Sequence, residues 1–342
     1  MTNKGSVLLV GPGFIGLQIL GELLSEGYPV TTLVRRKEAR ASLEKLGAKT
    51  ILGSLDDHNV VKHATVDSDI VIHTASADHL PSAISILDGI RERAQAGKST
   101  IYIHTSGYSA ITDKSNGNYK SEKLFEDDKP ETIDSIADDA PHRSIDLAIL
   151  RAQSEFGAKA KISIVLPPII YGVGKGNRLS IQLTTMTRFA IKHGYAGYIG
   201  GGNGVWGHVH VADLARGYMT ILHFLESTSE DGVLKNPYFF VENGEESSWG
   251  KCAEEIGKAL KDSGKIPDAS PRQIPTDLYN DLFGKWSLAV VGQNARNRAN
   301  RLRALGWKPR EKSAFNSLVE EELPIILAEK SQFTGYSAPV AS

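Results

Sequence analysis

The sequence predicts an α/β protein whose core is a doubly wound parallel sheet of the Rossmann type, with a smaller, interleaved C-terminal part. Three observations predict this fold class. Strand-like and helix-like segments alternate over residues 1–172. The first strand, Ser6–Val10, runs into a glycine-rich turn and then into an expected helix at Gly16–Ser25. Short polar segments follow the later strands, at the ends where such sheets bind ligands.

The turn has the spacing Gly11-x-Gly13-x-x-Gly16, and each glycine has its own physical task. Gly11 allows a tight turn, Gly13 lets the backbone approach a pyrophosphate, and Gly16 lets the helix pack closely on the strand. We also expect a positive φ at Gly13. The free N–H groups at the start of the helix then face the phosphate charge. The motif therefore predicts a dinucleotide site.

The second strand, Val30–Val34, ends in Arg35 and Arg36. The ribose of a bound dinucleotide is recognised at this place, where an acidic residue would accept hydrogen bonds from a free 2′-hydroxyl. Paired guanidinium groups suit a 2′-phosphate instead, because they bind it in a planar, bidentate manner. Lys37 and Arg40 add positive charge. We therefore expect NADP(H) as the cofactor in preference to NAD(H).

The later elements of the first domain follow in the order that the fold requires. A polar, acidic segment, Thr112–Pro141, lacks apolar periodicity and is expected to run over the surface. The expected helices are Ala39–Leu46, Ser82–Ala96 and His142–Gln153, and the expected strands are Thr50–Leu52, Asp69–His73, Thr100–His104 and Lys161–Leu166. These segments complete a dinucleotide-binding domain over residues 1–172.

Residues 173–330 are expected to form a smaller substrate-binding part interleaved with the sheet, and residues 331–342 a loose tail. The segment Gly194–Gly207 is rich in glycine and aromatic residues, which predicts a flexible loop bordering a pocket. Helices are expected within Lys175–His193, Ser247–Lys261 and Ala314–Leu323, the last one broken or kinked at Pro324.

Composition limits the classes of protein that the chain can be. It has 342 residues, 41% of them hydrophobic, and a formal net charge of −1, which fits a globular protein without the surplus charge for nucleic acid. The single cysteine, Cys252, excludes an internal disulfide framework and a multi-thiolate metal site. The ten histidines lack the pair spacing of a metal site, so we expect no metal. No apolar stretch approaches about 18 residues, so we expect no membrane segment and a cytoplasmic location.

A series of short motifs carries a family resemblance. After the glycine turn come Gly-Ser-Leu-Asp-Asp at 53–57, Val-Ile-His-Thr-Ala-Ser at 71–76, Ile-His-Thr-Ser-Gly at 103–107, Pro-Pro-Ile-Ile-Tyr-Gly at 167–172, Val-His-Val-Ala-Asp-Leu-Ala at 209–215 and Leu-Gly-Trp-Lys-Pro at 305–309. In this order they resemble the extended short-chain dehydrogenase/reductase superfamily over nearly the whole chain. Among its members, the chain is most similar to fungal epimerase/dehydratase-like and NmrA-like proteins.

The resemblance implies how a dinucleotide would be held. The glycine turn would cradle the pyrophosphate, the arginine pair would bind the adenosine phosphate, and later strand ends would border the adenine and the ribose. The implied residues are Gly11, Gly13, Phe14, Ile15, Gly16, Arg35, Arg36, Ser54, Leu55, Thr74, Ala75 and Ser76, with the backbone at Pro167, Pro168, Ile169 and Ile170 placing the nicotinamide.

The catalytic residues are where the chain departs from the family. The family's reductases use a Tyr that protonates the carbonyl, a Lys four residues later on the same helix face, and a Ser or Thr that hydrogen-bonds the substrate oxygen. In this chain His142 and Asp146 stand at the Tyr and Lys places. Gly107 stands at the Ser place, flanked by Ser106 and Tyr108.

Several residues are therefore candidates for proton transfer. We expect His142 to be the proton donor, because imidazole can donate near neutral pH, and Asp146 to accept from ribose hydroxyls or to orient His142. A pair that merely caps the helix is the alternative interpretation. Tyr108 and Tyr171 are alternative donors. A literal Tyr-x-x-x-Lys motif begins at Tyr119, but it lies in the polar segment, too soon after its strand.

We expect an NADP(H)-dependent oxidoreductase that acts on a small or medium carbonyl compound. One alternative is an epimerase or dehydratase-like enzyme without net redox, in which hydride leaves and returns. Another is an NADP(H)-sensing regulator of the NmrA-like kind, for which the lost Tyr and Lys would be no handicap. Cofactor turnover separates the three classes. The partners expected are a small-molecule substrate, no nucleic acid and no membrane, with a homodimer left open.

Overall fold

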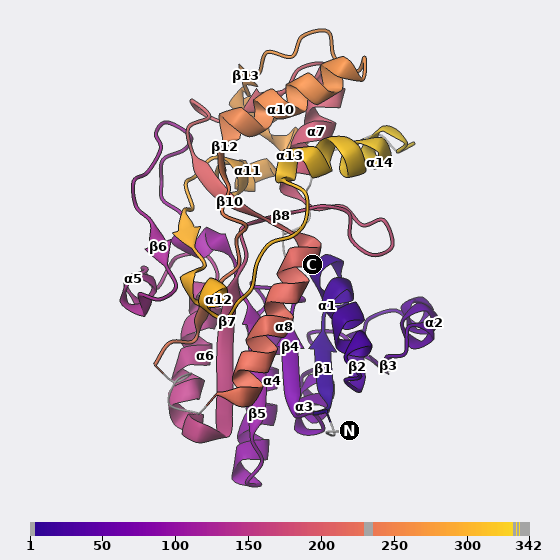
Figure 1. The fold of residues 1–342 in the computed structure, drawn as a ribbon, viewed down its shortest axis with the longest axis vertical. Coiled ribbons are helices and arrows are strands. Elements are labelled where there is room, and N and C mark those ends of the chain that lie inside the picture. Colours follow the sequence, from indigo (N-terminus) through magenta and orange to yellow (C-terminus); the bar gives the residue numbers. More distant parts are fainter. Residues whose placement is uncertain (1–3, 229–234, 331–332, 334, 336–342) are drawn as a thin grey trace.

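The computed structural model describes residues 4–228, 235–330, 333 and 335 (Figure 1). Its centre is a sheet of seven parallel strands, the doubly wound arrangement that the sequence predicts. The strands, in spatial order, are β11 (Tyr238–Phe240), β7 (Ala160–Leu166), β5 (Thr100–Thr105), β4 (Ile70–His73), β1 (Val7–Val10), β2 (Val30–Val34) and β3 (Lys49–Leu52). The order reverses between β1 and β4, which leaves a crevice at their carboxyl ends.

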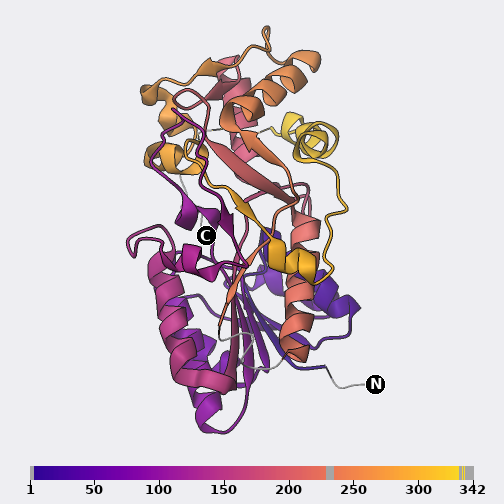
Figure 2. The same cartoon turned by 60° about the vertical axis from the view of Figure 1, so that its left-hand side comes forward.

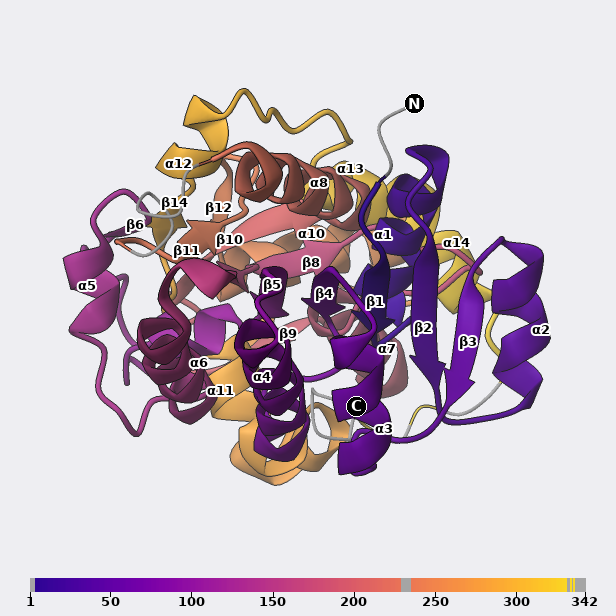
Figure 3. The same cartoon turned by 90° about the horizontal axis from the view of Figure 1, so that it is seen from below.

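Helices cover both faces of the sheet (Figure 3). On one face lie α1 (Phe14–Ser25) and α8 (Val211–Ser227), which pack against each other. On the other face lie α3 (His58–Val66), α4 (Leu80–Gln95) and α6 (Arg143–Phe156). The helix α2 (Glu38–Lys45) flanks the edge strand β3. Figure 2 shows the two helical layers from the side. Strands β1, β4 and β7 are buried along their length because helices cover both faces.

The second part lies above the carboxyl ends of the strands in Figure 1. It sends α8 and β11 back onto the main sheet, so the two parts are interleaved. Its strands are β8 (Ile169–Tyr171), β9 (Gly197–Tyr198), β10 (Val205–His210), β12 (Glu246–Ser248), β13 (Arg272–Gln273) and β14 (Asn297–Arg298). Its helices are α7 (Gln182–His193), α10 (Trp249–Asp262), α11 (Ser287–Val291), α12 (Asn300–Ala304), α13 (Ala314–Ser317) and α14 (Leu323–Leu327).

The structure corrects three expectations. Residues 205–207 belong to the buried strand β10, which pairs with β8 and β12, and are not part of a loop. The polar segment Thr112–Pro141 is anchored, because its short strand β6 (Phe125–Glu126) pairs with β14 and its helix α5 (Pro130–Asp134) buries Ile133. At the C-terminal helix, a π-helical turn over Leu318–Glu322 precedes Pro324, and it carries the helix through instead of breaking it.

No helix in the described ranges is long and apolar enough to cross a membrane. Within the same ranges, no three His, Cys, Asp or Glu side chains gather in a way that could hold a metal ion. The predicted tail, residues 331–342, lies outside the described residues except for 333 and 335.

A buried carboxylate fastens the C-terminal segment to the first turn of α8. Asp213 is fully buried, and its two oxygens accept hydrogen bonds from the backbone N–H groups of Arg310 and Glu311, at 2.9 and 3.0 Å. Arg216 pairs with the same carboxylate. Because Asp213 holds two backbone donors that have few other partners, it stabilises the path of the chain toward α13.

We expect Asp213→Ala to lower the free energy of unfolding by about 2–4 kcal/mol, because two part-buried N–H groups and Arg216 lose their buried acceptor. Urea denaturation followed by circular dichroism measures this loss. The matched control is Asp262→Ala at the exposed end of α10, which should change stability by less than about 0.5 kcal/mol. Equal effects of the two substitutions would contradict the anchoring role of Asp213.

Candidate active site

A cavity of about 1010 Å³ lies at the carboxyl ends of β1, β2, β4 and β5, beneath the second part of the molecule. Most of the residues expected to bind a dinucleotide or a substrate line it. They are Gly11, Gly13, Phe14, Ile15, Arg35, Arg36, Ser54, Leu55, Thr74, Ala75, Ser76, Ser106, Tyr108, His142, Pro167, Pro168 and Ile170. Segments far apart in the sequence therefore meet at one site, although the role of each residue stays a prediction.

The glycine turn forms one end of the cavity. Gly11 has φ +101°, and a Cβ there would lie 2.5 Å from the backbone of Ala75, so only glycine fits. A Cβ on Gly16 would lie 2.0 Å from the carbonyl oxygen of Gly11, which explains the close packing of α1. The positive φ expected at Gly13 is wrong: its φ is −91°. Apart from Gly13 and its two chain neighbours, no atom of the described residues lies within 4 Å of the position that a Gly13 Cβ would take.

The first turn of α1 begins at this open space. It contains no acidic residue, and its first N–H groups have no acceptor within the helix. Because the positive end of the helix dipole also points here, the turn suits an anion. The combination of Gly11, Gly13 and the start of the helix therefore fits a pyrophosphate.

Arg35 and Arg36 lie at the end of β2, exposed and against the cavity. Among the residues that the structure describes, neither guanidinium has a carboxylate partner. Arg40, by contrast, is engaged with Glu44 and Thr50. Two uncommitted positive charges at the adenosine end can therefore accept a phosphate without breaking an existing ion pair. Asp56, which also borders this end, pairs with His79 at 3.1 Å.

His142 lies at the far end of the cavity, immediately before α6. Its Nδ1 is 2.6 Å from Asp78 Oδ1, and its backbone is left-handed, with φ +67°. A Cβ on Gly107 would lie 3.2 Å from His142 Nε2, so the missing side chain makes room for the imidazole. With one ring nitrogen held by a carboxylate, the other is left beside the cavity, as in a general acid or base.

Asp146 is not the partner of His142, contrary to one expectation. It is buried on α6, does not line the cavity, and accepts a hydrogen bond from the Ser106 hydroxyl at 3.0 Å. The carboxylate on His142 comes from Asp78, four residues beyond Thr74. The position of Asp78 just after β4 is the only signal of its role in the sequence, since ligands gather at the ends of such strands.

The two alternative tyrosines are less suited to proton transfer. Tyr171 is fully buried away from the cavity, where its hydroxyl donates to the carbonyl oxygen of Lys312 at 2.7 Å and accepts from Asn243. Tyr108 lines the cavity, but burial and the facing carboxylate of Glu242 raise the pKa of its phenol well above the ordinary value.

Two further residues that were expected at the cofactor site pack behind the cavity and do not line it. Gly16 and Ile169 lie behind the cavity wall, Ile169 with no exposed surface. Tyr119, the first residue of the literal Tyr-x-x-x-Lys motif, is half exposed outside any helix and does not border the cavity.

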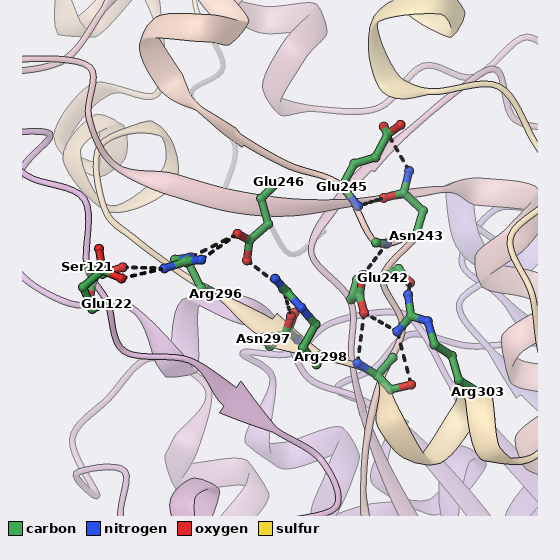
Figure 4. A network of polar contacts seen from close by, with 12 residues as sticks. Ser121, Glu122, Glu242, Asn243, Glu245, Glu246, Arg296, Asn297, Arg298 and Arg303 are labelled. Atoms are coloured by element: carbon green, nitrogen blue, oxygen red, sulfur yellow. Dashed lines mark hydrogen bonds and ion pairs between the residues drawn. The ribbon is translucent and has the colours of Figure 1, made fainter.

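The wall beyond Tyr108 is supported by a network of arginines and glutamates (Figure 4). Glu242 is buried and accepts hydrogen bonds from the backbone N–H of Ala299 and from Arg303. Glu246 binds Arg296 and Arg298 at 3.0 and 2.8 Å. These contacts join the segment after β11 to β14 and α12, so they hold the back of the cavity in place.

The second part of the molecule contributes both apolar and polar side chains to the cavity, the polar ones including Asn177, Arg178 and Gln182. The cavity walls include Trp206, which is 3% exposed, and four apolar side chains from three further segments that sequence reasoning did not single out as cavity residues. These are Leu179, Ile181, Val290 and Ile325. Arg188 also borders the cavity, but Glu329 binds both sides of its guanidinium, at 2.8 and 2.5 Å.

Comparison with known proteins identifies the cofactor class. Residues 11–136 match the family model described as NAD(P)H-binding. This similarity supports a nicotinamide dinucleotide as the class of cofactor. It is 26% identical over 352 residues to the protein named Oxidase ucsJ from an Acremonium species, a match that covers 95% of this chain and 97% of that protein.

The NAD(P)H-binding domain and the rest of the chain share the fold of NAD-dependent epimerases and dehydratases. The UDP-glucose 4-epimerase of Thermotoga maritima superposes with a TM-score of 0.67 at 16% identity, covering 94% of this chain and 99% of the epimerase. The dTDP-glucose 4,6-dehydratase of Bacillus anthracis, solved with NAD, gives 0.66 at 13% identity, covering 92% and 95%. The fold expected from the resemblance to extended short-chain dehydrogenases/reductases is confirmed.

Gly11 and Gly13 have different roles, which two substitutions separate. We expect Gly13→Val to abolish the fluorescence enhancement of NADPH while the midpoint of thermal unfolding changes by less than about 3 °C, because the new side chain enters open space in front of α1. Gly11→Ala should instead lower the free energy of unfolding by about 1–3 kcal/mol, because its Cβ meets Ala75 at a left-handed φ. A folded Gly13→Val protein that binds NADPH normally would exclude this turn as the pyrophosphate site.

Proposed function

We propose that the protein is an NADP(H)-dependent oxidoreductase that reduces a small or medium-sized, largely apolar carbonyl compound. The observation that carries the proposal is the His142–Asp78 pair, which stands beside the cavity where the family's catalytic tyrosine would stand. The NAD(P)H-binding domain supplies the class of cofactor, and the similarity to a protein named as an oxidase favours net redox chemistry.

The preference for NADP(H) rests on charge. Arg35 and Arg36 border the end of the cavity next to Ser54 and Leu55, where the adenosine of the cofactor would lie. A 2′-phosphate would offer its oxygens to two guanidinium groups, whereas a 2′-hydroxyl would leave both unsatisfied. The backbone turn at Gly11 would serve either cofactor, so the arginines alone would set the preference.

The residues around His142 would perform the acid step of the reduction. Bound NADPH supplies a hydride to the carbonyl carbon. The imidazolium form of His142 would give its Nε2 proton to the carbonyl oxygen, which becomes the hydroxyl of the product. The neutral imidazole would keep its proton on Nδ1 and donate it in a hydrogen bond to Asp78. This hydrogen bond fixes the tautomer and the direction of the ring. Ser106, which directly follows β5, would offer its hydroxyl from beside Gly107.

The nature of the walls favours an uncharged substrate. Trp206, Ile181 and Val290 would contact it through apolar surface, and Arg188 is already neutralised by Glu329. Arg178 also borders the cavity and has no carboxylate partner among the described residues, so the preference for an uncharged substrate rests on the apolar side chains alone. A screen of NADPH oxidation against aldehydes, ketones and enones, with the product identified by mass spectrometry, tests the proposal directly.

An epimerase or dehydratase-like activity is the second candidate, because the solved structures of the same fold are named for such reactions. It differs from the proposal in cofactor use. A reductase oxidises NADPH in proportion to product, an enzyme without net redox leaves the cofactor unchanged, and a regulator binds NADP(H) without forming any product. Product formation at constant NADPH would therefore overturn the oxidoreductase proposal.

We expect the double substitution Arg35→Asp, Arg36→Ala to weaken NADPH binding by more than about tenfold, or about 1.4 kcal/mol, because charge-assisted contacts to the phosphate are lost. NADH binding should change little. Isothermal titration calorimetry with both cofactors measures the difference. Arg40→Ala, which removes a nearby arginine already paired with Glu44, is the matched control and should spare both affinities. Equal losses for NADPH and NADH would refute recognition of the 2′-phosphate.

We expect His142→Asn to lower turnover by roughly 100-fold or more, the usual scale for a positioned acid, while cofactor affinity is nearly unchanged. Asparagine tolerates the left-handed backbone of this position, so the variant should fold. Asp78→Asn should lower turnover in the same direction but less. Tyr119→Phe is the control and should be silent, since that residue lies outside the cavity. Full activity of His142→Asn would exclude this residue as the acid.

A further inference from the structure

Ser106 and Asp146 form a buried hydroxyl–carboxyl pair at the end of β5. The Ser106 Oγ lies 3.0 Å from Asp146 Oδ2, and the two residues are only 3% and 2% exposed. Ser106 borders the cavity, whereas Asp146 stands behind it. The second carboxyl oxygen, Asp146 Oδ1, has no hydrogen-bond partner in the part of the chain that the structure describes. Asp146 is therefore connected to the cavity by its hydrogen bond with the Ser106 hydroxyl.

Few charges compensate this carboxyl. On its own helix it faces His142, which is bound to Asp78, and Arg143, whose guanidinium donates to Tyr238 and to the carbonyl oxygen of Asp134. None of the ion pairs found among the described residues includes Asp146. An ionised Asp146 would consequently rest on one hydrogen bond from Ser106.

The elements packed against α6 add no cation close to Asp146. On β5 it faces the Tyr102 phenol, and His104 lies beyond, fully buried, where desolvation holds the pKa of the imidazole well below its usual value. On α4 the charged group that reaches α6 is Arg91, which binds Glu155 more than two turns further along. Burial raises the pKa of Asp146 to about 7, even though Ser106, His142 and Arg143 lower it.

We propose that the protonation state of Asp146 sets the direction of the Ser106 hydroxyl and thereby selects between a carbonyl and an alcohol in the cavity. Protonated Asp146 donates to Ser106 Oγ, so the Ser106 O–H is free to donate to a carbonyl oxygen. Ionised Asp146 accepts the Ser106 proton, so only lone pairs face the cavity, and these suit the hydroxyl of an alcohol. The inference rests on the proposed function for the carbonyl and alcohol pair.

This arrangement gives Asp146 a positioning role that differs from that of a lysine at the same place. A lysine is a cation that can only donate, so it cannot reverse the hydrogen bond of its neighbour. A carboxyl group whose pKa lies near neutral pH can reverse this hydrogen bond, because it donates when it is protonated and accepts when it is ionised. As pH rises through the pKa of Asp146, the affinity for the carbonyl compound therefore falls and the affinity for the alcohol rises.

Kinetics of the purified full chain with the best carbonyl compound of the screen and its alcohol test the inference. Between pH 6 and pH 8 the KM for the carbonyl should rise about tenfold, as the protonated fraction of Asp146 falls about tenfold, and the KM for the alcohol should fall. Asp146→Asn and Ser106→Ala should each flatten both profiles. Asp138→Asn, an exposed neighbour, should keep the original profile. An unchanged profile in Asp146→Asn would overturn the inference.

Infrared spectroscopy of the cofactor-free protein provides a readout that needs no activity. The carbonyl stretch of a protonated buried carboxyl, assigned by its loss in Asp146→Asn, should be present at pH 6, disappear by pH 8, and shift in Ser106→Ala. Absence of this band at pH 6 would overturn the inference whether or not carbonyl compounds are reduced. A titrating band in a protein that reduces nothing would leave the pair intact and refute the proposed function instead.

Discussion

The close approach of the chain at Gly11 is the constraint on which the rest of the site depends. Its backbone touches that of Ala75 at the end of β4, and the Thr74 hydroxyl donates to the Gly11 carbonyl oxygen at 2.8 Å. Gly16 then brings α1 against the same carbonyl oxygen. These contacts leave no room for side chains, so the start of α1 is fixed over the crevice between β1 and β4. The anion site and the cavity in front of it follow from that geometry.

The chemistry of the site rests on compensating changes around one imidazole. Gly107 lacks the side chain that the family places there, and the space is occupied by His142. The left-handed backbone of His142 costs conformational energy, of order 1–3 kcal/mol for a non-glycine residue, and the hydrogen bond to Asp78 helps to hold the residue in that conformation. Ser106 stands next to Gly107 with its own carboxyl partner. The imidazole of His142 and the hydroxyl of Ser106, each held by its own carboxyl partner, therefore meet at the end of β5.

The second part of the molecule shapes the cavity through buried polar contacts. Glu242 and Glu246 bind arginines that would otherwise be costly to bury, and each pair fixes a loop against β14 or α12 (Figure 4). The ion pair between Arg188 and Glu329 joins α7 to the end of the C-terminal helix beside the cavity. This last pair neutralises a charge on the cavity wall, whereas the Glu242 and Glu246 pairs lie behind it.

The sequence by itself determined the parallel sheet, the glycine turn and the cofactor class, because the strand pattern and the glycine spacing are each contained in short segments, although the contacts that assemble them join distant strands. Local patterns also predicted α6, and the family resemblance predicted the approach of His142 to the cavity. They failed at β10, whose strand is defined by pairing with β8 and β12, and at π-turn residues 318–322, where packing overrides the effect of Pro324.

Only the tertiary structure decided which carboxyl group hydrogen-bonds to His142 and which to Ser106. The spacing of His142 and Asp146 suggested one helix face, but α6 begins at Arg143, and the left-handed turn at His142 directs its ring toward Asp78. Asp146 instead accepts a hydrogen bond from Ser106, a residue 40 positions away in the sequence. Such partners are set by the end of one strand meeting the start of a distant helix, and no local pattern in the sequence specifies that meeting.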